Sequence, residues 1–459
     1  MRFNYFGLLD IIPAVIWLVI LIIIANSYRS KHTEKEHYKY FMPNLYAKWS
    51  FGLIFALFYI LVYRGGDTVA YFETLRTLNK LLLHNPAGWW EQMTSGPSSE
   101  MVNRLFDIRS TGFPPGWIYR EENSLFVAKV FSFLGMITFN SYWATTLIIG
   151  FFTARASWRL YELALRYSMH NSNWLAYGVL FLPSVAFWCS GVSKDALVFV
   201  AALYLVFHLF RIITPEYKAT WRNYVYAIFF LWLIVNIRGF MAAGILIPVG
   251  LAYFSRVLRS RGTSEGTIIG IYVFTTFVGI VGFGGTLASQ SEEELLRTNT
   301  FLQEAQLVQQ DFAQNETYGN RRYDLGEVEF TPIGLLRSTP LSILTGIYRP
   351  FLWESLTPSL LFNGLESIVL LYFTILLLLR SPWQKLKTIT ANEFLMFCLV
   401  FTLLIAFMAG FTSILFGVLV RIRAPLLPFL FILLTLDYNQ IIGKKEPADT
   451  EVLEVSSSN

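Results

Sequence analysis

Long apolar stretches recur along almost the whole chain, with short polar segments between them. A helix needs about 20 apolar residues to cross the hydrocarbon core of a bilayer. We therefore predict an all-α, polytopic membrane protein with about eleven transmembrane helices. The expected spans are residues 8–27, 47–63, 126–154, 172–190, 194–213, 222–238, 240–257, 266–285, 358–380, 392–411 and 413–436.

Because the apolar stretches recur along almost the whole chain, residues 1–445 are interpreted as a single integral membrane domain. Residues 446–459 are rich in Ser and acidic residues and are expected to form a disordered tail. The first apolar run, Leu8 to Ala25, is not followed by a small-residue cleavage site. We therefore expect it to be retained as the first helix rather than removed as a signal peptide.

Lys and Arg gather in one set of connections, which sets the predicted orientation. The segment after the first helix carries Arg29, Lys31, Lys35, Lys39 and Lys48, and the positive-inside rule places it in the cytoplasm. The other basic segments fall on the same side if 126–154 crosses the membrane once. These segments are residues 155–166, 211–222, 256–261 and 380–387 and the tail with Lys444 and Lys445. The N-terminus is then outside and the C-terminus cytoplasmic.

Two long segments, 64–123 and 285–338, are then expected outside. The first contains Pro114-Pro115 and little continuous hydrophobicity. The second begins with a helical pattern of apolar residues between Leu295 and Phe312. Both are rich in aromatic and amphipathic positions, so we expect them to lie on the membrane surface.

Composition supports the membrane interpretation and excludes several function classes. Apolar residues make up 54% of the chain. Charged residues make up only 15%, whereas they are roughly a quarter of a soluble domain. The net charge of +5 does not indicate nucleic acid, because the basic residues sit at helix ends. Cys189 and Cys398 lie inside apolar runs and suit neither a disulfide nor a zinc site. No nucleotide-binding loop, His-rich metal set or serine-nucleophile motif is present, so we expect no metal and no cofactor.

The first candidate for chemistry is Asp67, which follows Gly65-Gly66 directly after the second predicted helix. In a helix, Asp67 and Tyr71 would share one face, four residues apart. A carboxylate here could act as a general base on a sugar hydroxyl, with Tyr71 binding substrate. The alternative is a carboxylate that only caps a surface helix. Glu73, Arg76 and Lys80 are expected on a solvated face.

The second candidate is the break between two apolar runs at Ser193-Lys194-Asp195. Ser193 is a plausible N-cap, and Asp195 suits a first helical turn. Lys194 beside a helix N-terminus would form an anion site suited to a phosphate. The alternative is a tight hairpin with ordinary capping and a lysine that extends to the interface.

Arginines at predicted membrane depth are the third set. Arg238 lies between two predicted helices, Arg349 precedes Pro350, and Arg421 and Arg423 flank the break before Pro425. Ionisable residues at this depth are costly and default to a functional hypothesis, and guanidinium groups bind phosphate well. Arg421 and Arg423 would point to opposite sides of a regular helix, so one of them is expected to face a cavity. The alternative is that each arginine anchors a helix at the interface or pairs with Glu354 or Glu366.

Several short motifs together resemble a known group of proteins. They are Gly66-Asp67 with Tyr71, Phe187-Trp188 with Ser190-Gly191 and Lys194-Asp195, Ile237-Arg238, Arg349-Pro350-Phe351 with Trp353-Glu354, and Arg421 to Pro428. They are similar to bacterial EpsG- and Wzy-type polysaccharide repeat-unit polymerases and, more widely, to GT-C membrane glycosyltransferases.

The resemblance implies a GT-C-like fold in the cytoplasmic (inner) membrane of a bacterium. It also implies that Asp67 is the catalytic base. Lys194, Asp195, Arg238, Arg349, Arg421 and Arg423 would then bind a polyprenyl-(pyro)phosphate-linked saccharide. The chain departs from the usual GT-C plan by an extra helix before the acidic loop and by the lack of a metal-binding acidic pair there, and both departures favour the polymerase type.

We therefore expect glycosyl transfer between lipid-linked saccharides at the outer face of the membrane, in contact with membrane lipid and possible other envelope polysaccharide proteins. One alternative is a transporter or flippase for the same amphiphile, which would use the same arginines but need no base. Another is a structural subunit of an envelope complex.

The predicted orientation can be tested with a reporter that is active only in the cytoplasm. We expect activity when the reporter is fused after Lys445 and no activity when it is inserted near Asn315, because these positions fall on opposite sides. A reporter that works at Asn315 would reverse the orientation and move the candidate residues to the cytoplasmic side.

Overall fold

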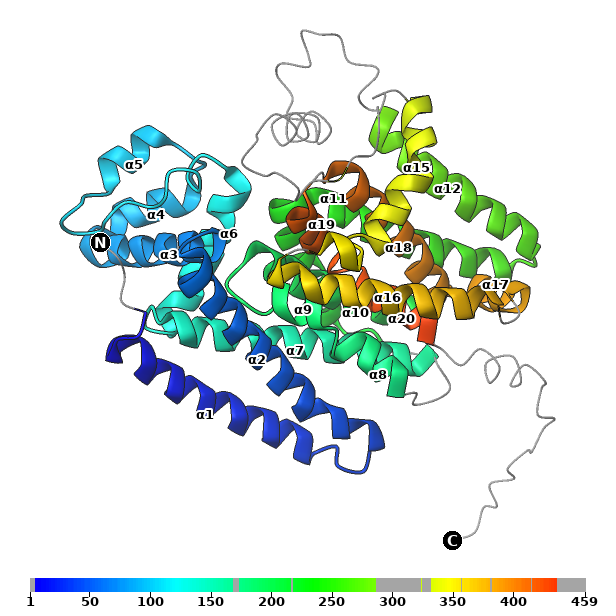
Figure 1. Cartoon of the computed structure of the whole chain (residues 1–459), viewed down its shortest axis with the longest axis horizontal. Coiled ribbons are helices and arrows are strands. Elements are labelled where there is room, and N and C mark those ends of the chain that lie inside the picture. Colours follow the sequence, from blue (N-terminus) through cyan, green and yellow to red (C-terminus); the bar gives the residue numbers. More distant parts are fainter. Residues whose placement is uncertain are drawn as a thin grey trace.

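The computed structural model describes residues 5–167, 173–215, 218–285, 323, 332–355, 357–379, 382–413 and 415–435. The regular elements in these residues are helices (Figure 1). They are α1 (Leu8–Ser30), η1 (Glu36–Tyr40), α2 (Phe41–Leu57), η2 (Phe58–Tyr63), α3 (Asp67–His84), α4 (Pro86–Thr94), α5 (Ser99–Leu105), α6 (Glu122–Ile137), α7 (Tyr142–Tyr167), α8 (Asn173–Leu180), α9 (Pro183–Trp188), α10 (Lys194–Ile213), α11 (Trp221–Ser260), α12 (Glu265–Gly285), α15 (Pro332–Tyr348), η4 (Leu352–Glu354), α16 (Pro358–Leu379), α17 (Pro382–Ala391), α18 (Glu393–Thr412), α19 (Phe416–Arg423) and α20 (Leu427–Thr435).

The all-α prediction is confirmed for the described residues and their apolar helices are consistent with a multi-pass membrane protein, but the count of eleven spans is not confirmed. Among the described residues, six helical stretches are long and apolar enough to cross a membrane, or up to eight if two bent helix pairs each form one span. Part of the difference lies in the expected span 172–190, which the structure divides into the short helices α8 and α9. Residues 286–322, with the predicted amphipathic pattern of 295–312, and the tail 446–459 lie outside the described residues.

The 40-residue helix α11 is two helices joined at Arg238, whose backbone leaves the helical region (φ −150°, ψ 83°). A straight helix of this length would span about 60 Å, twice the hydrocarbon core. Near its start, Asn223 lies beside His208 of α10 (3.2 Å), and near its end Arg256 donates to the carbonyl of Ile213, the last residue of α10. Both ends of α11 therefore lie at the same end of α10, and the break coincides with the predicted boundary between 222–238 and 240–257.

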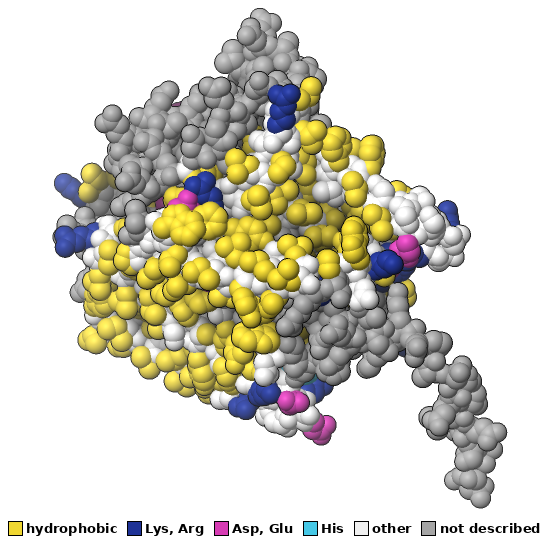
Figure 2. All heavy atoms as spheres, turned by 45° about the vertical axis from the view of Figure 1, so that its right-hand side comes forward, with side chains coloured by type: hydrophobic (Ala, Val, Ile, Leu, Met, Phe, Trp, Pro, Cys, Tyr) yellow, Lys and Arg dark blue, Asp and Glu magenta, His cyan; other side chains and the backbone are white. Residues whose placement is uncertain are grey.

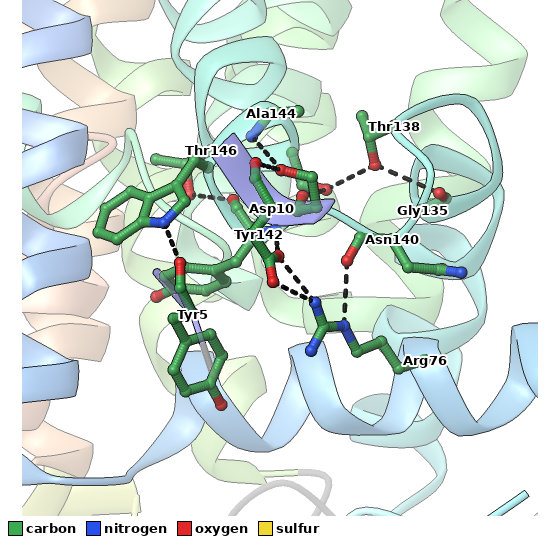
Figure 3. A network of polar contacts seen from close by, with 12 residues as sticks. Tyr5, Asp10, Arg76, Gly135, Thr138, Asn140, Tyr142, Ala144 and Thr146 are labelled. Carbon is green, nitrogen blue, oxygen red and sulfur yellow. Dashed lines mark hydrogen bonds and ion pairs between the residues drawn. The ribbon is translucent and has the colours of Figure 1, made fainter. Parts of the chain in front are cut away.

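The expected span 126–154 is also not one helix, because α6 and α7 meet at 108°. Figure 3 shows the polar contacts that hold this corner. The Asp10 carboxylate accepts from Arg76 Nη2 (2.7 and 2.9 Å) and from the backbone N–H of Tyr142 (3.1 Å). Arg76 Nε donates to the carbonyl of Asn140, which has positive φ (56°). The expectation that Arg76 lies on a solvated face was therefore wrong: its side chain is only 15% exposed and pairs with the buried Asp10.

The segment 64–123 contains α3, α4 and α5 and has a small core of its own. Leu78, Leu81, Val102 and Phe106 are buried together, with Trp89 packed against them. In Figure 1, α3, α4 and α5 form a group beside the longer helices. A contact with the membrane surface stays a prediction for this segment.

The basic helix ends meet at one end of the molecule, which we call the basic end. Arg256 pairs with Glu393 at the start of α18, and Arg259 Nη2 donates to the carbonyl of Thr390 at the end of α17. These contacts join the ends of α10, α11, α17 and α18. The predicted grouping on one membrane side agrees with this arrangement, while the compartment stays a prediction.

Two basic positions differ from the expected connections. Residues 155–166 lie within α7, which continues to Tyr167, because the arginines there have aromatic and acidic partners: Arg155 lies over the Tyr28 ring at 4.0 Å, and Arg159 pairs with Glu162 at 2.6 Å. Lys48 is not in a loop but on α2, and it is fully buried.

The molecule presents a broad apolar surface on the face seen in Figure 2, and charged side chains lie mainly at its margins. In the most apolar stretch of α1, only 22% of the residues are buried inside the protein. In the corresponding stretch of α18, 89% are buried. An apolar helix left exposed in this way requires contact with lipid, so α1 lies at the periphery and α18 at the centre.

Small residues bring α15 and α18 into close contact. A Cβ added to Gly346 would lie 2.0 Å from the carbonyl oxygen of Ala406, and one added to Gly410 would lie 1.9 Å from that of Ser342. Such close backbone approach is how small residues join helices in membranes.

We predict that Gly346→Ala lowers the melting temperature of the detergent-solubilised protein, because the new methyl group forces α15 and α18 apart. Gly250→Ala in α11 is the matched control, since nothing lies within 4 Å of the added Cβ. Helix propensity alone favours Ala by about 1 kcal/mol in both helices. An equal shift in melting temperature for the two variants would contradict the close packing.

Candidate functional site

A short irregular segment positions Asp67. Residues Phe58–Tyr63 form a π-helix, a feature that occurs frequently at functional sites. The chain then turns through Gly66, whose φ of 93° favours glycine. A Cβ at Gly66 would lie 2.9 Å from the ring of Tyr59. The turn thus places Asp67, the first residue of α3, close to Tyr59.

Asp67 pairs with Arg421 from α19, which is 354 positions away in the chain (Nη1–Oδ2, 2.5 Å). The same guanidinium donates to the hydroxyl of Tyr59 and lies over the ring of Trp188, with its Cζ 4.9 Å from the ring centroid. The Arg421 side chain is 24% exposed, whereas the Asp67 carboxylate remains 47% exposed. The arginine is therefore held from three sides, and the carboxylate stays accessible to a ligand.

A second ion pair, more deeply buried, lies at the start of α10. Ser193 caps the helix and accepts from the backbone N–H of Ala196 at 3.1 Å, as predicted. Asp195 in the first turn pairs with Arg238 at the break of α11 (2.5 Å), and their side chains are 7% and 12% exposed. Asp195 is thus both a first-turn acid and the counter-ion of Arg238.

Lys194 connects the two ion pairs electrostatically. The charges that act on it belong to Arg238, Glu121, Asp195 and Asp67. Asp195 also acts on Arg421. We call Asp67, Glu121, Lys194, Asp195, Arg238 and Arg421 the Asp67 cluster. It holds three acids and three bases, so its formal charge is balanced.

Tyr71 supports the cluster from inside the protein. It is buried, its hydroxyl donates to Ser124 Oγ (3.3 Å), and Ser124 in turn donates to Glu121 (2.7 Å). Burial raises the pKa of Tyr71, so the phenol stays protonated. Asp67 and Tyr71 therefore do not share an exposed face, and Tyr71 positions Glu121 rather than facing open space.

The Asp67 cluster and the basic end lie at opposite ends of α10. Lys194 and Asp195 begin this helix and Ile213 ends it, so the two are separated by about 30 Å. This length matches the hydrocarbon thickness of a bilayer. The cluster is therefore placed where one membrane surface would be, and the basic end where the other would be.

Arg349 and Arg423 do not join the Asp67 cluster. Arg349 pairs with Glu354, one of the two partners considered from sequence, and lies over the ring of Tyr323. Arg423 is fully buried and donates to the carbonyls of Ile347 (3.0 Å) and Arg349 (2.6 Å). Both arginines have partners of their own in this arrangement, and a role in substrate binding stays a prediction for them. Arg421 is the member of its pair that reaches Asp67.

A second set of buried charges joins the helices at greater depth. Glu366 on α16 accepts from the backbone N–H of Ser184 at 2.7 Å and from its hydroxyl. Its charge acts on both Arg423 and Lys48, which are fully buried. Within the described residues, Lys48 Nζ has no hydrogen-bond partner. Glu366 is thus the acid that compensates two buried cations.

Sequence reasoning missed Glu121, Tyr59 and Trp188 as members of the site. Trp188 adjoins the break before Ser193, which was a usable signal. Tyr59 is one aromatic residue among many in an apolar run, and Glu121 is one of two consecutive acids. Only the folded arrangement distinguishes these two from their neighbours.

The described residues contain no group of three or more His, Cys, Asp or Glu side chains that could hold a metal ion. The two cysteines are buried and free. No protein-family model matches the sequence, and the curated proteins and the solved structures give no match either. The chemistry of the site must therefore be argued from its geometry.

We predict that Asp195→Asn lowers stability far more than Asp67→Asn. Removing one partner of a buried pair costs about 3–5 kcal/mol, whereas an exposed pair contributes about 0–1 kcal/mol. Melting temperatures in detergent would show this difference. If Asp67→Asn is as destabilising as Asp195→Asn, Asp67 is a structural anchor rather than an available carboxylate.

Proposed function

We propose that this chain is a membrane glycosyltransferase of the polysaccharide-polymerase type, working at the outer face of the bacterial cytoplasmic membrane. Its donor would be a polyprenyl-(pyro)phosphate-linked saccharide and its acceptor a sugar hydroxyl of a second lipid-linked glycan. The observation that carries the proposal is the half-exposed Asp67 carboxylate held beside Arg421. Lys194 lies within electrostatic range of Asp67 and of Arg238.

The arrangement supports a simple role for each group. The incoming phosphate competes for Arg421, because guanidinium groups bind phosphate as readily as carboxylate. Asp67, released from its partner, accepts the proton of the acceptor hydroxyl as the hydroxyl oxygen bonds to the anomeric carbon. The bond from that carbon to the phosphate oxygen breaks, and the phosphate leaves with the electron pair.

The charge balance of the Asp67 cluster suits this reaction. Protonation of Asp67 removes one negative charge from a balanced set, and the leaving phosphate supplies one in the same place. Arg421, Lys194 and Arg238 would stabilise that developing charge, and such electrostatic stabilisation is usually the largest catalytic effect. The membrane location fits a substrate whose lipid stays in the bilayer while its head reaches the cluster.

A transporter of the same amphiphile is the second candidate, and one observation favours it. Helices break beside the cluster, at Arg238 in α11 and between α19 and α20, which meet at 63°. Discontinuous helices of this kind surround substrate sites in many transporters. A transporter would use Arg421 for binding but would not need Asp67 as a base.

The Asp67→Asn variant separates the two functions. We expect it to lower the rate of polymer formation from a synthetic polyprenyl-diphosphate saccharide by about 100-fold or more, because general base catalysis contributes this much. Binding of the same substrate should change less than about threefold, since Arg421, Lys194 and Arg238 remain. Gel analysis of the product and thermal-shift titration measure the two quantities.

Glu100→Gln is the matched control, an exposed acid in the same 64–123 segment, and it should retain full activity. Unchanged polymer formation by Asp67→Asn would rule out the base. If neither the wild type nor Asp67→Asn forms polymer, but both move the lipid-linked saccharide across vesicles equally, the transporter is correct.

A further inference from the structure

A cleft at the basic end carries four arginines and is unrelated to the Asp67 cluster. It lies between α7, α10 and α11 and has a volume of about 600 Å³. Arg155 and Arg159 come from α7, Arg211 from the last turn of α10, and Arg222 from the first turn of α11. We call it the arginine cleft.

The charged side chains that line the arginine cleft are its four arginines. None of the described residues that line it is acidic. Glu162, which follows on α7, pairs with Arg159 at 2.6 Å. Four guanidinium groups from three helices around one cleft attract an anion to the space between them. The cleft is therefore suited to an anionic ligand.

The chemistry of the lining side chains suits a phosphate group. Asn223 and His208 contribute polar groups and are hydrogen-bonded to each other at 3.2 Å. Guanidinium groups bind phosphate oxygens through two parallel N–H donors, which gives both strength and orientation. A volume of about 600 Å³ holds a phosphate headgroup with its glycerol, but not two acyl chains.

The cleft continues into an apolar wall that faces outward. Phe152, Tyr226 and Phe229 line it and are themselves exposed, and the neighbouring Ile228 and Trp232 on α11 are exposed as well. Aromatic and aliphatic side chains exposed on a membrane helix contact acyl chains. A ligand with its charge in the cleft would thus have its apolar part against α11.

The position of the arginine cleft relative to the membrane surface distinguishes a lipid ligand from a soluble anion. Arg211 and Arg222 lie at helix ends, where the headgroups of a bilayer would be, and the exposed aromatic wall runs from there along α11. A soluble phosphate would use the arginines but leave this wall without a partner. Basic pockets between membrane helices on the positively charged side recognise anionic lipid headgroups in this way.

We infer that the arginine cleft binds the phosphate headgroup of an anionic glycerophospholipid from the leaflet at the basic end. The acyl chains lie along the exposed face of α11. This site does not depend on the function proposed for the Asp67 cluster, and it would exist in an enzyme or a transporter alike.

The test uses the full-length protein in detergent and native mass spectrometry with titrated phosphatidylglycerol or cardiolipin. We expect saturable binding of these lipids and at least tenfold weaker binding of phosphatidylcholine. The double variant Arg211→Gln/Arg222→Gln should weaken binding of the anionic lipids at least tenfold. Arg222→Gln alone is a milder variant, at an exposed position where folding is not at risk, and should weaken binding about threefold.

The control is Arg29→Gln/Arg261→Gln, which removes two exposed arginines from helix ends outside the cleft and should change binding less than twofold. Equal losses in the control and the cleft variants would mean that net charge, not the cleft, attracts the lipid. Inorganic diphosphate tests the other source of phosphate. If it raises the melting temperature as much as the lipids do at equal concentration, the ligand is a soluble anion and the lipid assignment is wrong.

Discussion

A charge inside an apolar environment is expensive unless it is paired, and this constraint determines which helices of this protein meet. Asp10 joins α1 to α3 through Arg76, and Asp67 joins the start of α3 to α19 through Arg421. Asp195 and Arg238 join α10 to the break in α11. The Asp67–Arg421 pair connects segments 354 positions apart in the chain. The apolar faces alone would allow many alternative packings, and the ion pairs select one of them.

The candidate site arises where regular helices stop. The π-helix before Gly66 contacts α19 just before its bend, through Tyr59 and Arg421. The capped start of α10 contacts the break in α11 through Asp195 and Arg238. A helix that ends or bends frees its backbone and turns its last side chains inward, so charged residues can converge there. The cluster is thus a consequence of the interruptions, and the same interruptions would let the helices move if the protein were a transporter.

Much of the candidate site could be predicted from the sequence, and the predictions that were not met have physical reasons. Scarcity of charge made Asp67, Lys194, Arg238 and Arg421 conspicuous, and the structure brings these four together. Arg349 and Arg423 were equally conspicuous but are satisfied locally, by Glu354 and by backbone carbonyls. Hydropathy could not separate a crossing helix from the α6–α7 corner, because a 108° bend is held by Asp10 and Arg76, which are remote from it in sequence. Hydropathy also could not show that Lys48 is buried, because the acid that compensates its charge, Glu366, is remote from it in the sequence.

The interior between the two charged ends bears on the choice between enzyme and transporter. A transporter would have to carry an anionic head over about 30 Å, the length of α10, from one end to the other. Lys48, Glu366 and Arg423 are enclosed by protein, and none has more than 6% of its surface exposed. Passage would require the helices that hold them to separate and these charges to lose their compensation. An enzyme that works at one end needs no such opening, because its lipid substrate reaches the Asp67 cluster from the bilayer. The packed interior therefore favours chemistry at one surface over transport through the helices.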